Sequence, residues 1–368
     1  MEKKKIAILS AFYEPYMSGA EQMVKEIVEN LGDRYEMILV TGRFDKKLAR
    51  VEQRKTFKLI RVGIGHKQID KLLYPLLAAL RTRRFAPVIA HAIMESYAGG
   101  ALVLLKYLYP RARRILTLQS GDLDSDMKQG QKILRLFFGV IHRSPHIVTA
   151  ISRFLGERAK RLGVPEERII ITPNGVYLSA IPQGAQRISH RVICVARLSW
   201  EKGLDYLVRA WPEVLAKVPD ARLVLVGEGD KRGEIESLIK ELKIGDCVEL
   251  KGNLPHDRVL DELVKSEVFI CPSLAEGLGI VFIEAQACGL AVVGTNVGGI
   301  PDVITDRENG LLIEPKDSAA IGRALVALLT DQELARGLVA RARQSVKKFD
   351  WLNVLKQIDG LYQNTNHN

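Results

Sequence analysis

The amino-acid sequence predicts an α/β protein of two domains, each built on a doubly wound parallel sheet of the Rossmann-like kind. Short segments rich in Val, Ile and Leu alternate with amphipathic stretches, and this alternation runs through both halves of the chain. The length of 368 residues exceeds one ordinary core and suits two domains of roughly 150 to 190 residues each. Turn residues at 172–176, Thr-Pro-Asn-Gly-Val, mark the candidate crossover.

Six short strands are expected in each half of the chain. In the first half they cover Lys5–Ser10, Glu36–Thr41, Lys58–Val62, Val88–Ala92, Arg114–Leu118 and Ile147–Ile151. In the second half they cover Arg191–Ala196, Arg222–Val226, Cys247–Lys251, Val268–Cys271, Ala291–Gly294 and Leu311–Ile313. Helical patterns such as Ala20–Leu31 and Phe154–Leu162 separate most of them, so each set should form a parallel sheet with helical crossovers.

The first domain is expected to comprise residues 1–173 and the second residues 174–349. After Phe349, apolar residues recur with the spacing of one helix face, as at Trp351, Val354 and Ile358. This C-terminal helix, residues 350–368, is predicted to pack back across the junction and to join the first domain.

Composition indicates a globular chain, since 47% of the residues are hydrophobic and 26% are charged. The four cysteines have no zinc-site spacing and lie in apolar segments, which favours reduced core thiols in a cytoplasmic protein without a metal site. Met1–Lys5 is basic but leads into a strand instead of a signal-peptide core. The longest apolar runs are shorter than a membrane span.

Positive charge is concentrated in the first half. Residues 1–190 contain 32 Lys and Arg against 17 Asp and Glu, whereas the remainder contains 22 against 26. The segment Ile69–Phe85 joins an apolar run to a cationic end, as helices at an anionic membrane surface do. Buried leucines with a solvated basic tail explain the same pattern equally well. Nucleic acid is disfavoured because aromatic residues are only 6% and no nucleic-acid motif accompanies the charge.

The segment 273–284 carries the strongest functional signal. Glu276 and Glu284 flank the glycines of Glu-Gly-Leu-Gly, which follow a buried strand and lead into an apolar helix. Open α/β sheets bind ligands at this carboxyl edge of their strands. Backbone amides there can hold an anion, while each carboxylate can accept bonds from a pair of hydroxyls. A buried carboxylate such as Glu284 needs partners, because it is costly without them. This combination fits a sugar joined to a nucleotide through a diphosphate.

Two cations are predicted to lie at the same edge. Arg197 and Lys202 follow the strand Arg191–Ala196, and Arg offers a planar fork for phosphate while Lys offers a compact point charge. Together with the glycine amides they would form a diphosphate clamp. In the first domain, Gly19 opens a helix after the first strand and provides another candidate anion site. The G-x-G-x-x-G fingerprint is missing there, which argues against a nicotinamide enzyme.

Polar residues near the ends of two strands in the first domain are the candidates for the acceptor side. They are His91, Glu95, Gln119 and Asp122. A histidine after a strand is more often structural than catalytic, and Asp122 has an alternative as a helix cap.

The ordered motifs resemble the retaining two-domain glycosyltransferases of family 4, which have the GT-B fold of two Rossmann-like domains facing a central cleft. The resemblance extends over nearly the whole chain and is strongest from 191 to about 315. Its motifs are Arg197-x4-Lys202, Val226-Gly-Glu-Gly229, Cys271-Pro-Ser273, Glu276-Gly-Leu-Gly279 with Glu284, and Gly298-Gly-Ile-Pro-Asp302, with Pro15–Gly19 and Pro173–Val176 matching earlier in the chain.

The resemblance implies roles for these positions. Arg197 and Lys202 would bind the donor diphosphate, Glu284 the ribose and Glu276 the transferred sugar, with Asn253 and Leu254 beside the base. The implied donor-binding set is Gly19, Gln119, Arg197, Lys202, Gly227, Asn253, Leu254, Glu276, Gly277, Leu278, Gly279, Ile280 and Glu284. The candidate catalytic set is Glu276, Arg197, Lys202, His91 and Asp122.

Enzymes of this family retain the anomeric configuration and generally need no metal, so no cofactor is expected. Two departures fall outside the donor motifs. Gln119 stands where many relatives have a histidine; it cannot act as a base but can hydrogen-bond a sugar hydroxyl. Tyr177 stands where an aspartate is common.

The resulting hypothesis is a cytoplasmic glycosyltransferase, peripheral to the inner face of the cell membrane, that acts on a lipid-linked or glycan acceptor in polysaccharide or glycolipid synthesis. An epimerase or hydrolase of the same fold and a noncatalytic sugar-nucleotide binding protein remain alternatives. They differ from the transferase in donor turnover without acceptor and in the effect of Glu276→Ala.

Overall fold

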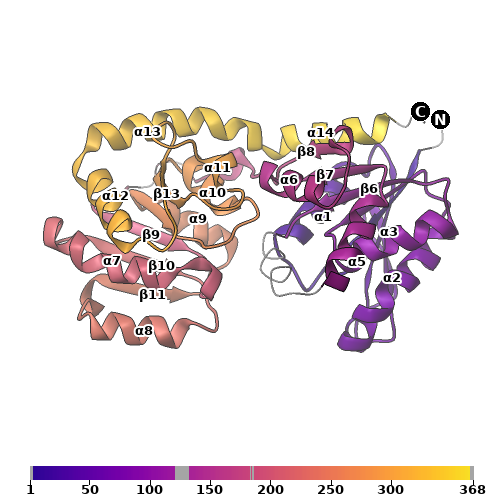
Figure 1. The fold of residues 1–368 in the computed structure, drawn as a ribbon, viewed down its shortest axis with the longest axis horizontal. Helices are drawn as coiled ribbons and strands as arrows, with labels where there is room; N and C mark the ends of the chain where they lie inside the picture. The colour runs from indigo at the N-terminus through magenta and orange to yellow at the C-terminus, as the bar shows by residue number, and fades with distance from the viewer. Residues whose placement is uncertain (1–2, 121–131, 183, 185, 365–368) are drawn as a thin grey trace. The chain divides into compact units, whose positions relative to one another are not determined.

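The computed structural model describes residues 3–120, 132–182, 184 and 186–364, with side chains from 132 to 137 left out. The chain forms two compact units (Figure 1). Unit 1 comprises Met1–Gly175 and Trp351–Asn368, and unit 2 comprises Val176–Asp350. The chain therefore leaves unit 1 two residues after the predicted boundary at 173 and returns to it after Asp350.

Unit 1 contains an eight-stranded sheet in the order β3-β4-β2-β1-β5-β6-β7-β8, parallel except for the pairing of β3 with β4. The strands are β1 (Lys5–Leu9), β2 (Glu36–Gly42), β3 (Val51–Gln53), β4 (Phe57–Val62), β5 (Ile89–Ile93), β6 (Arg113–Leu118), β7 (Ile147–Ala150) and β8 (Ile169–Ile171). All six predicted strands form. The two that were not predicted, β3 and β8, are three-residue strands at opposite edges of the sheet.

Helices pack on the sheet of unit 1 and bury it (Figure 1). They are α1 (Gly19–Asn30), α2 (Lys67–Arg83), α3 (Tyr97–Leu108), α5 (Lys132–Arg143), α6 (Arg153–Arg161), η1 (Glu166–Arg168) and α14 (Trp351–Gln363). The C-terminal helix α14 forms as predicted and packs within unit 1. There the Tyr35 hydroxyl donates to Asp359 at 2.7 Å, and Arg34 pairs with the same carboxylate.

Unit 2 contains a six-stranded, fully parallel sheet in the order β11-β10-β9-β12-β13-β14. The strands are β9 (Arg191–Val195), β10 (Arg222–Val226), β11 (Val248–Gly252), β12 (Val268–Cys271), β13 (Ala291–Thr295) and β14 (Leu311–Ile313). The helices are η2 (Leu178–Ala180), η3 (Trp200–Lys202), α7 (Leu204–Lys217), α8 (Arg232–Glu241), η4 (Gly245–Cys247), α9 (His256–Val264), α10 (Ile280–Ala287), α11 (Ile300–Val303), α12 (Ser318–Thr330), α13 (Gln332–Ser345) and η5 (Val346–Phe349).

The strand order of unit 2 reverses between β9 and β12. From β9 the chain proceeds outward through β10 and β11, and it then returns to place β12 on the other side of β9. The loops that follow β9 and β12 therefore leave the sheet side by side at its carboxyl edge. Such a switch point is where open α/β sheets bind ligands, so this topology brings the predicted cations and carboxylates to one place.

The cysteines Cys194, Cys247, Cys271 and Cys288 are buried and free. Among the helices that the structure describes, none combines the length and hydropathy that crossing a membrane requires.

Candidate active site

An ion pair joins the two loops at the switch point of unit 2. Lys202 ends η3 after β9, Glu276 follows β12, and the Lys202 Nζ atom donates to the Glu276 carboxylate at 2.7 Å. The two side chains are only 17% and 18% exposed. The structure thus brings together two residues that lie 74 positions apart and that sequence patterns assigned to one site.

Backbone contacts hold the two loops together. The Leu274 N–H donates to the Glu201 carbonyl at 2.7 Å. Gly203 has a φ of 59°, and a Cβ atom there would lie 2.5 Å from the Pro272 carbonyl oxygen. Only a glycine permits both this backbone conformation and this approach. These contacts therefore hold the backbone of Lys202 in a fixed position relative to the loop that contains Glu276.

The loop after β13 packs against the backbone of Glu276 and Gly277. Added Cβ atoms on Gly298 and Gly299 would lie 2.0 Å and 2.1 Å from the carbonyl oxygens of Glu276 and Gly277. The Gly299 N–H also donates to the Glu276 carbonyl at 3.0 Å. The motif Gly298-Gly-Ile-Pro-Asp302 had no role assigned from sequence beyond its resemblance. In the structure this motif packs against the backbone of the loop that contains Glu276 and holds that loop in place.

Helix α10 begins directly after the loop that contains Glu276. Gly279 precedes its first residue and has a φ of 84°, a left-handed conformation that favours glycine. The first N–H groups of a helix have no partner within it and attract anions. The backbone of Gly277, Leu278, Gly279 and Ile280 therefore lies where a diphosphate or a sugar hydroxyl could accept bonds next to Lys202 and Glu276.

Glu284, one turn along α10, is bonded to a histidine that sequence patterns did not identify. The His256 Nε2 atom lies 2.8 Å from the Glu284 carboxylate, and Glu284 is 14% exposed whereas His256 is 69% exposed. The hydrogen bond to Glu284 raises the pKa of His256. The expectation that a buried Glu284 needs a partner is confirmed. The signal for His256 was its place at the start of α9, separated by Pro255 alone from the predicted base-binding segment Asn253-Leu254.

Arg197 does not close onto Glu276 in the structure. Its guanidinium is 65% exposed and pairs with Glu201 at 3.2 Å. Burial alone would raise the pKa of Glu201, but the Ser199 hydroxyl and the two cations Arg197 and Lys202 favour the charged form, and the net shift is downward. Arg197 therefore precedes the short helix η3 that contains Lys202, and its exposed side chain is directed to Glu201 of that helix.

Gly227 brings the loop after β10 against the loop after β9. Its φ is 134°, and a Cβ atom would lie 2.0 Å from the Ala196 carbonyl oxygen. The Gly227 N–H donates to the Gly252 carbonyl at 2.8 Å, which ties in the loop after β11. That loop continues with an exposed Asn253 and a half-buried Leu254. Gly227 thus acts through close backbone packing, and Asn253 and Leu254 lie near α9 and its histidine.

Comparison with known protein families identifies the family to which this chain belongs. The model of Glycosyltransferase Family 4 matches residues 17–180, and the model of Glycosyl transferases group 1 matches residues 185–345, including every loop described above. The chain belongs to the GT-B glycosyltransferases.

Individual relatives agree with this assignment. The phosphatidylinositol N-acetylglucosaminyltransferase gpi3 subunit of Schizosaccharomyces pombe is 28% identical, with 96% of this chain and 79% of that protein covered. The N-acetyl-alpha-D-glucosaminyl L-malate synthase of Bacillus anthracis is 27% identical, with 95% and 94% covered. A solved structure of sucrose-phosphate synthase from Thermosynechococcus elongatus superposes with a TM-score of 0.83 at 21% identity over 98% of each chain, so the two share a fold.

In unit 1 of this glycosyltransferase, His91 lies inside β5 and not beyond its end. It is 1% exposed; its Nδ1 atom lies 2.7 Å from the Tyr362 hydroxyl and its Nε2 atom 2.6 Å from the Thr117 hydroxyl. Burial lowers the pKa of His91 to about 3. The prediction of His91 as a catalytic residue facing an acceptor is corrected here: the imidazole is neutral, has both nitrogens bonded, and joins α14 to the sheet.

The other unit 1 candidates of the glycosyltransferase have different surroundings. Glu95 is fully buried and pairs with Arg158, which also donates to the Ser120 carbonyl at 2.6 Å. Gln119 exchanges two amide hydrogen bonds with Asn174, at 3.1 Å and 2.9 Å. Gly19 is exposed at the first residue of α1. Asp122 lies outside the described residues.

Proposed function

We propose that this glycosyltransferase takes its sugar from a nucleotide-diphosphate sugar and transfers it, with retention of anomeric configuration, to a lipid-linked or glycan acceptor. The observation that carries the proposal is the Lys202–Glu276 pair next to the first residues of α10. A cation, a carboxylate and the amino end of a helix at one sheet edge match a ligand that contains phosphate and hydroxyl groups together.

Each group has a task in this scheme. The Lys202 ammonium neutralises the diphosphate as it leaves, and Arg197 swings from Glu201 to join it. Glu276 then accepts hydrogen bonds from hydroxyls of the transferred sugar. Glu284 exchanges its bond to His256 for bonds to the ribose. In this scheme Lys202 and Arg197 supply the charge stabilisation, and the two carboxylates orient the donor.

The reaction breaks the bond between the anomeric carbon and the phosphate oxygen and forms a bond between that carbon and the acceptor oxygen. Retention follows if the acceptor attacks from the face that the diphosphate leaves. The acceptor proton then passes to a phosphate oxygen of the departing nucleotide. Such a step needs no protein base, which is consistent with a buried, neutral His91.

The acceptor class is supported by similarity and by charge. The Schizosaccharomyces pombe relative is named for transfer to phosphatidylinositol, whereas the Bacillus anthracis relative is named for transfer to L-malate. The excess of Lys and Arg in residues 1–190 favours an acceptor held at an anionic surface. We therefore place the enzyme in glycolipid or polysaccharide synthesis, in the cytoplasm at the inner face of the membrane.

Turnover of a panel of nucleotide sugars tests the proposal, with phosphatidylinositol, a glycan and L-malate as acceptors and with none. Formation of a glycoside whose anomeric configuration matches the donor by NMR supports it. An inverted product contradicts the retaining mechanism. Donor consumption that needs no acceptor favours a hydrolase or epimerase, and nucleotide binding with wild-type turnover absent favours a noncatalytic binding protein.

A further inference from the structure

An open groove lies between α7 and α8 in unit 2. These two helices pack against each other (Figure 1), and the groove has a volume of about 990 Å³. Clefts that bind small molecules measure about 300 to 1,000 Å³, so this one has room for a ligand of several rings. Residues between 204 and 209 line it on the side of α7, and residues between 233 and 241 line it on the side of α8. None of the described residues assigned above to the donor lines this cavity, which is called the α7–α8 groove below.

An exposed tryptophan lines the α7–α8 groove. Trp200 is 56% exposed, whereas the other two tryptophans of the chain, Trp211 and Trp351, are 0% and 3% exposed. The half-buried Tyr206 lines the same groove. Aromatic rings provide large apolar surfaces in binding sites, and those of Trp and Tyr also carry a polar group. The flat C–H face of a sugar ring stacks on such a surface, while its hydroxyls point sideways to polar groups.

Charged residues of both signs surround these rings. They include Asp205, Asp230, Glu234, Arg209, Lys231 and Lys316. The Lys231 ammonium pairs with Glu234 at 2.6 Å. The hydrogen bond to Glu234, together with the charges of Asp230 and Asp205, raises the pKa of Lys231. The positive charge at this point of the groove is therefore already balanced by carboxylates.

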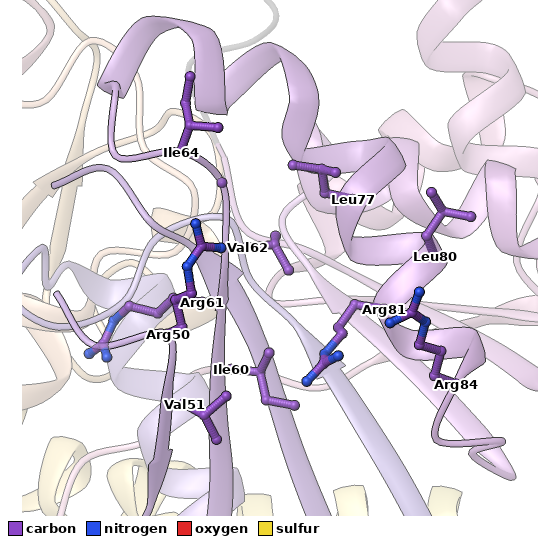
Figure 2. Close-up of a pocket in the computed structure, with 11 residues that line it drawn as sticks. Arg50, Val51, Ile60, Arg61, Val62, Ile64, Leu77, Leu80, Arg81 and Arg84 are labelled. Atoms are coloured by element: carbon purple, nitrogen blue, oxygen red, sulfur yellow. The ribbon is translucent and has the colours of Figure 1, made fainter. Parts of the chain in front are cut away.

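A pocket of unit 1 between β4 and α2 shows the contrast. Every charged residue that lines this second pocket is an arginine, and Figure 2 shows the four guanidinium groups, those of Arg50, Arg61, Arg81 and Arg84. In the α7–α8 groove an anion would instead meet several carboxylates. Hydroxyl groups both donate and accept hydrogen bonds, so a neutral ligand rich in hydroxyls finds partners among cations and carboxylates alike.

The α7–α8 groove shares its wall with the active-site loops. Trp200 precedes Lys202 in η3, and Leu274, which also lines the groove, precedes Glu276 after β12. The Leu274 N–H donates to the Glu201 carbonyl at 2.7 Å and ties these two segments together. A ligand in the groove therefore contacts the same loops that carry the proposed donor groups.

We propose that the α7–α8 groove binds a neutral oligosaccharide, with one pyranose ring stacked on Trp200 and its hydroxyls bonded to charged side chains of α7 and α8. The aromatic surface, the balanced charges and the volume all fit this class of ligand. A chain held there would stay beside the donor site between transfers. That role rests on the glycan-acceptor form of the proposed function, whereas binding itself does not.

Acrylamide quenching of tryptophan fluorescence in the full chain tests the inference without any nucleotide sugar. Because Trp211 and Trp351 are buried, acrylamide should quench mainly Trp200. The probes are maltohexaose, chitohexaose and a linear mannohexaose. At least one of them should protect Trp200 in a saturable manner, and added salt should leave this binding unchanged because the ligand is neutral. Protection by none of the three overturns the proposal, as does tighter, salt-sensitive binding of a heparin hexasaccharide.

A variant of the tryptophan locates the sugar. Trp200→Ala should weaken binding of the protecting oligosaccharide about tenfold, measured by calorimetry, since the stacked ring is lost. The matched control Tyr107→Ala removes a ring that is 75% exposed in unit 1, and it should bind the sugar as the wild type does. Wild-type affinity in Trp200→Ala overturns the groove as the site. Binding of uridine diphosphate verifies that the neighbouring donor loops are intact.

A second variant tests the polar wall away from the donor loops. Asp205→Asn with Arg209→Gln removes two exposed charges of α7 and should weaken the same binding. Arg323→Gln with Glu333→Gln removes one charge of each sign from exposed positions of α12 and α13, and it should have no effect. Equal affinities in the two double variants overturn the proposal. Thermal unfolding verifies that both retain the fold.

Separate readouts distinguish this inference from the proposed function. Protection of Trp200 by an oligosaccharide, together with failed transfer from every nucleotide sugar, counts against the proposed function and supports the groove. Normal transfer to a glycan without any protection of Trp200 overturns the groove alone. Protection that grows with protein concentration in the absence of sugar assigns this surface to a second copy of the chain and also overturns the proposal.

Discussion

The two units place their polar residues differently although both are parallel sheets. In unit 2, Lys202 and Glu276 lie beyond the ends of β9 and β12, where they meet at the edge of the sheet. In unit 1, His91 lies inside β5 and becomes part of the core. A sheet covered on both faces buries residues in the middle of its inner strands, whatever their polarity. Position relative to the strand end therefore decides whether a polar residue serves stability or chemistry.

Glu95 shows that lying beyond the strand end is not sufficient. It follows β5 by two residues, yet it is buried against Arg158. Lys202 and Glu276 also form an ion pair but keep part of their surface exposed. A carboxylate held by a fully buried arginine cannot exchange that partner at low energetic cost, whereas a partly exposed pair can open toward a ligand.

The largest expected effect on activity is at Lys202. Lys202→Met keeps the length of the side chain but removes the charge that faces the leaving diphosphate, so kcat/KM should fall about 10²- to 10³-fold. Steady-state turnover of the donor measures it. Lys231→Met is the control, because Lys231 pairs with Glu234 outside the site. Full activity in Lys202→Met would mean that the pair in unit 2 is structural like the one in unit 1.

The converse substitution in unit 1 should act on stability. Glu95→Gln leaves the buried Arg158 without its counter-charge and should lower the free energy of unfolding by about 3 to 5 kcal/mol. Urea unfolding measures the change, and the double variant with Arg158→Met should recover part of it. A large loss of transfer with unchanged stability would place Glu95 in the active site and erase the contrast between the units.

The buried histidine predicts an acid-sensitive component of stability. The pKa of His91 is lowered by burial to about 3, whereas in the unfolded chain it is near 6.5. Its contribution is complete above about pH 6.5 and is lost as the pH falls toward 3, because the unfolded state binds the proton more readily. Unfolding free energies between pH 4 and 7 should be flatter for His91→Asn than for the wild type. Parallel curves for the two proteins would show that His91 is not buried and neutral.

The smallest expected effect is at His256, where stability should depend on pH in the opposite direction to His91. Glu284 raises the pKa of this imidazole, so its stabilisation is complete below about pH 6.5 and is lost as the pH rises through the raised value. Because His256 is largely exposed, the change should stay below about 1 kcal/mol. Melting temperatures at pH 6 and pH 8 for the wild type and His256→Gln would reveal it. A donor bound through Glu284 should abolish the difference.

Sequence patterns predicted most of the fold because strand composition and turn residues are local. All twelve predicted strands formed, including the three-residue β14, while the equally short β3 and β8 at the edges of the unit 1 sheet were not predicted. The loop with Glu276 was recognisable because its glycines and the following helix are contiguous in the chain. His256 was not, since its bond to Glu284 depends on how α9 packs beside α10. His91 was misassigned because alternation says nothing about depth in a sheet that is covered on both faces.

The glycine pair under Glu276 has a consequence for changing donor preference. Gly298 and Gly299 contact the backbone of Glu276 and Gly277 so closely that any side chain there would lift the glutamate loop. Under the proposed function, this backbone packing helps to set where Glu276 meets the donor sugar. A mutagenesis library aimed at new sugars should hold positions 298 and 299 constant and vary the half-buried Leu274 and Ala275, where side chains can change without moving the loop.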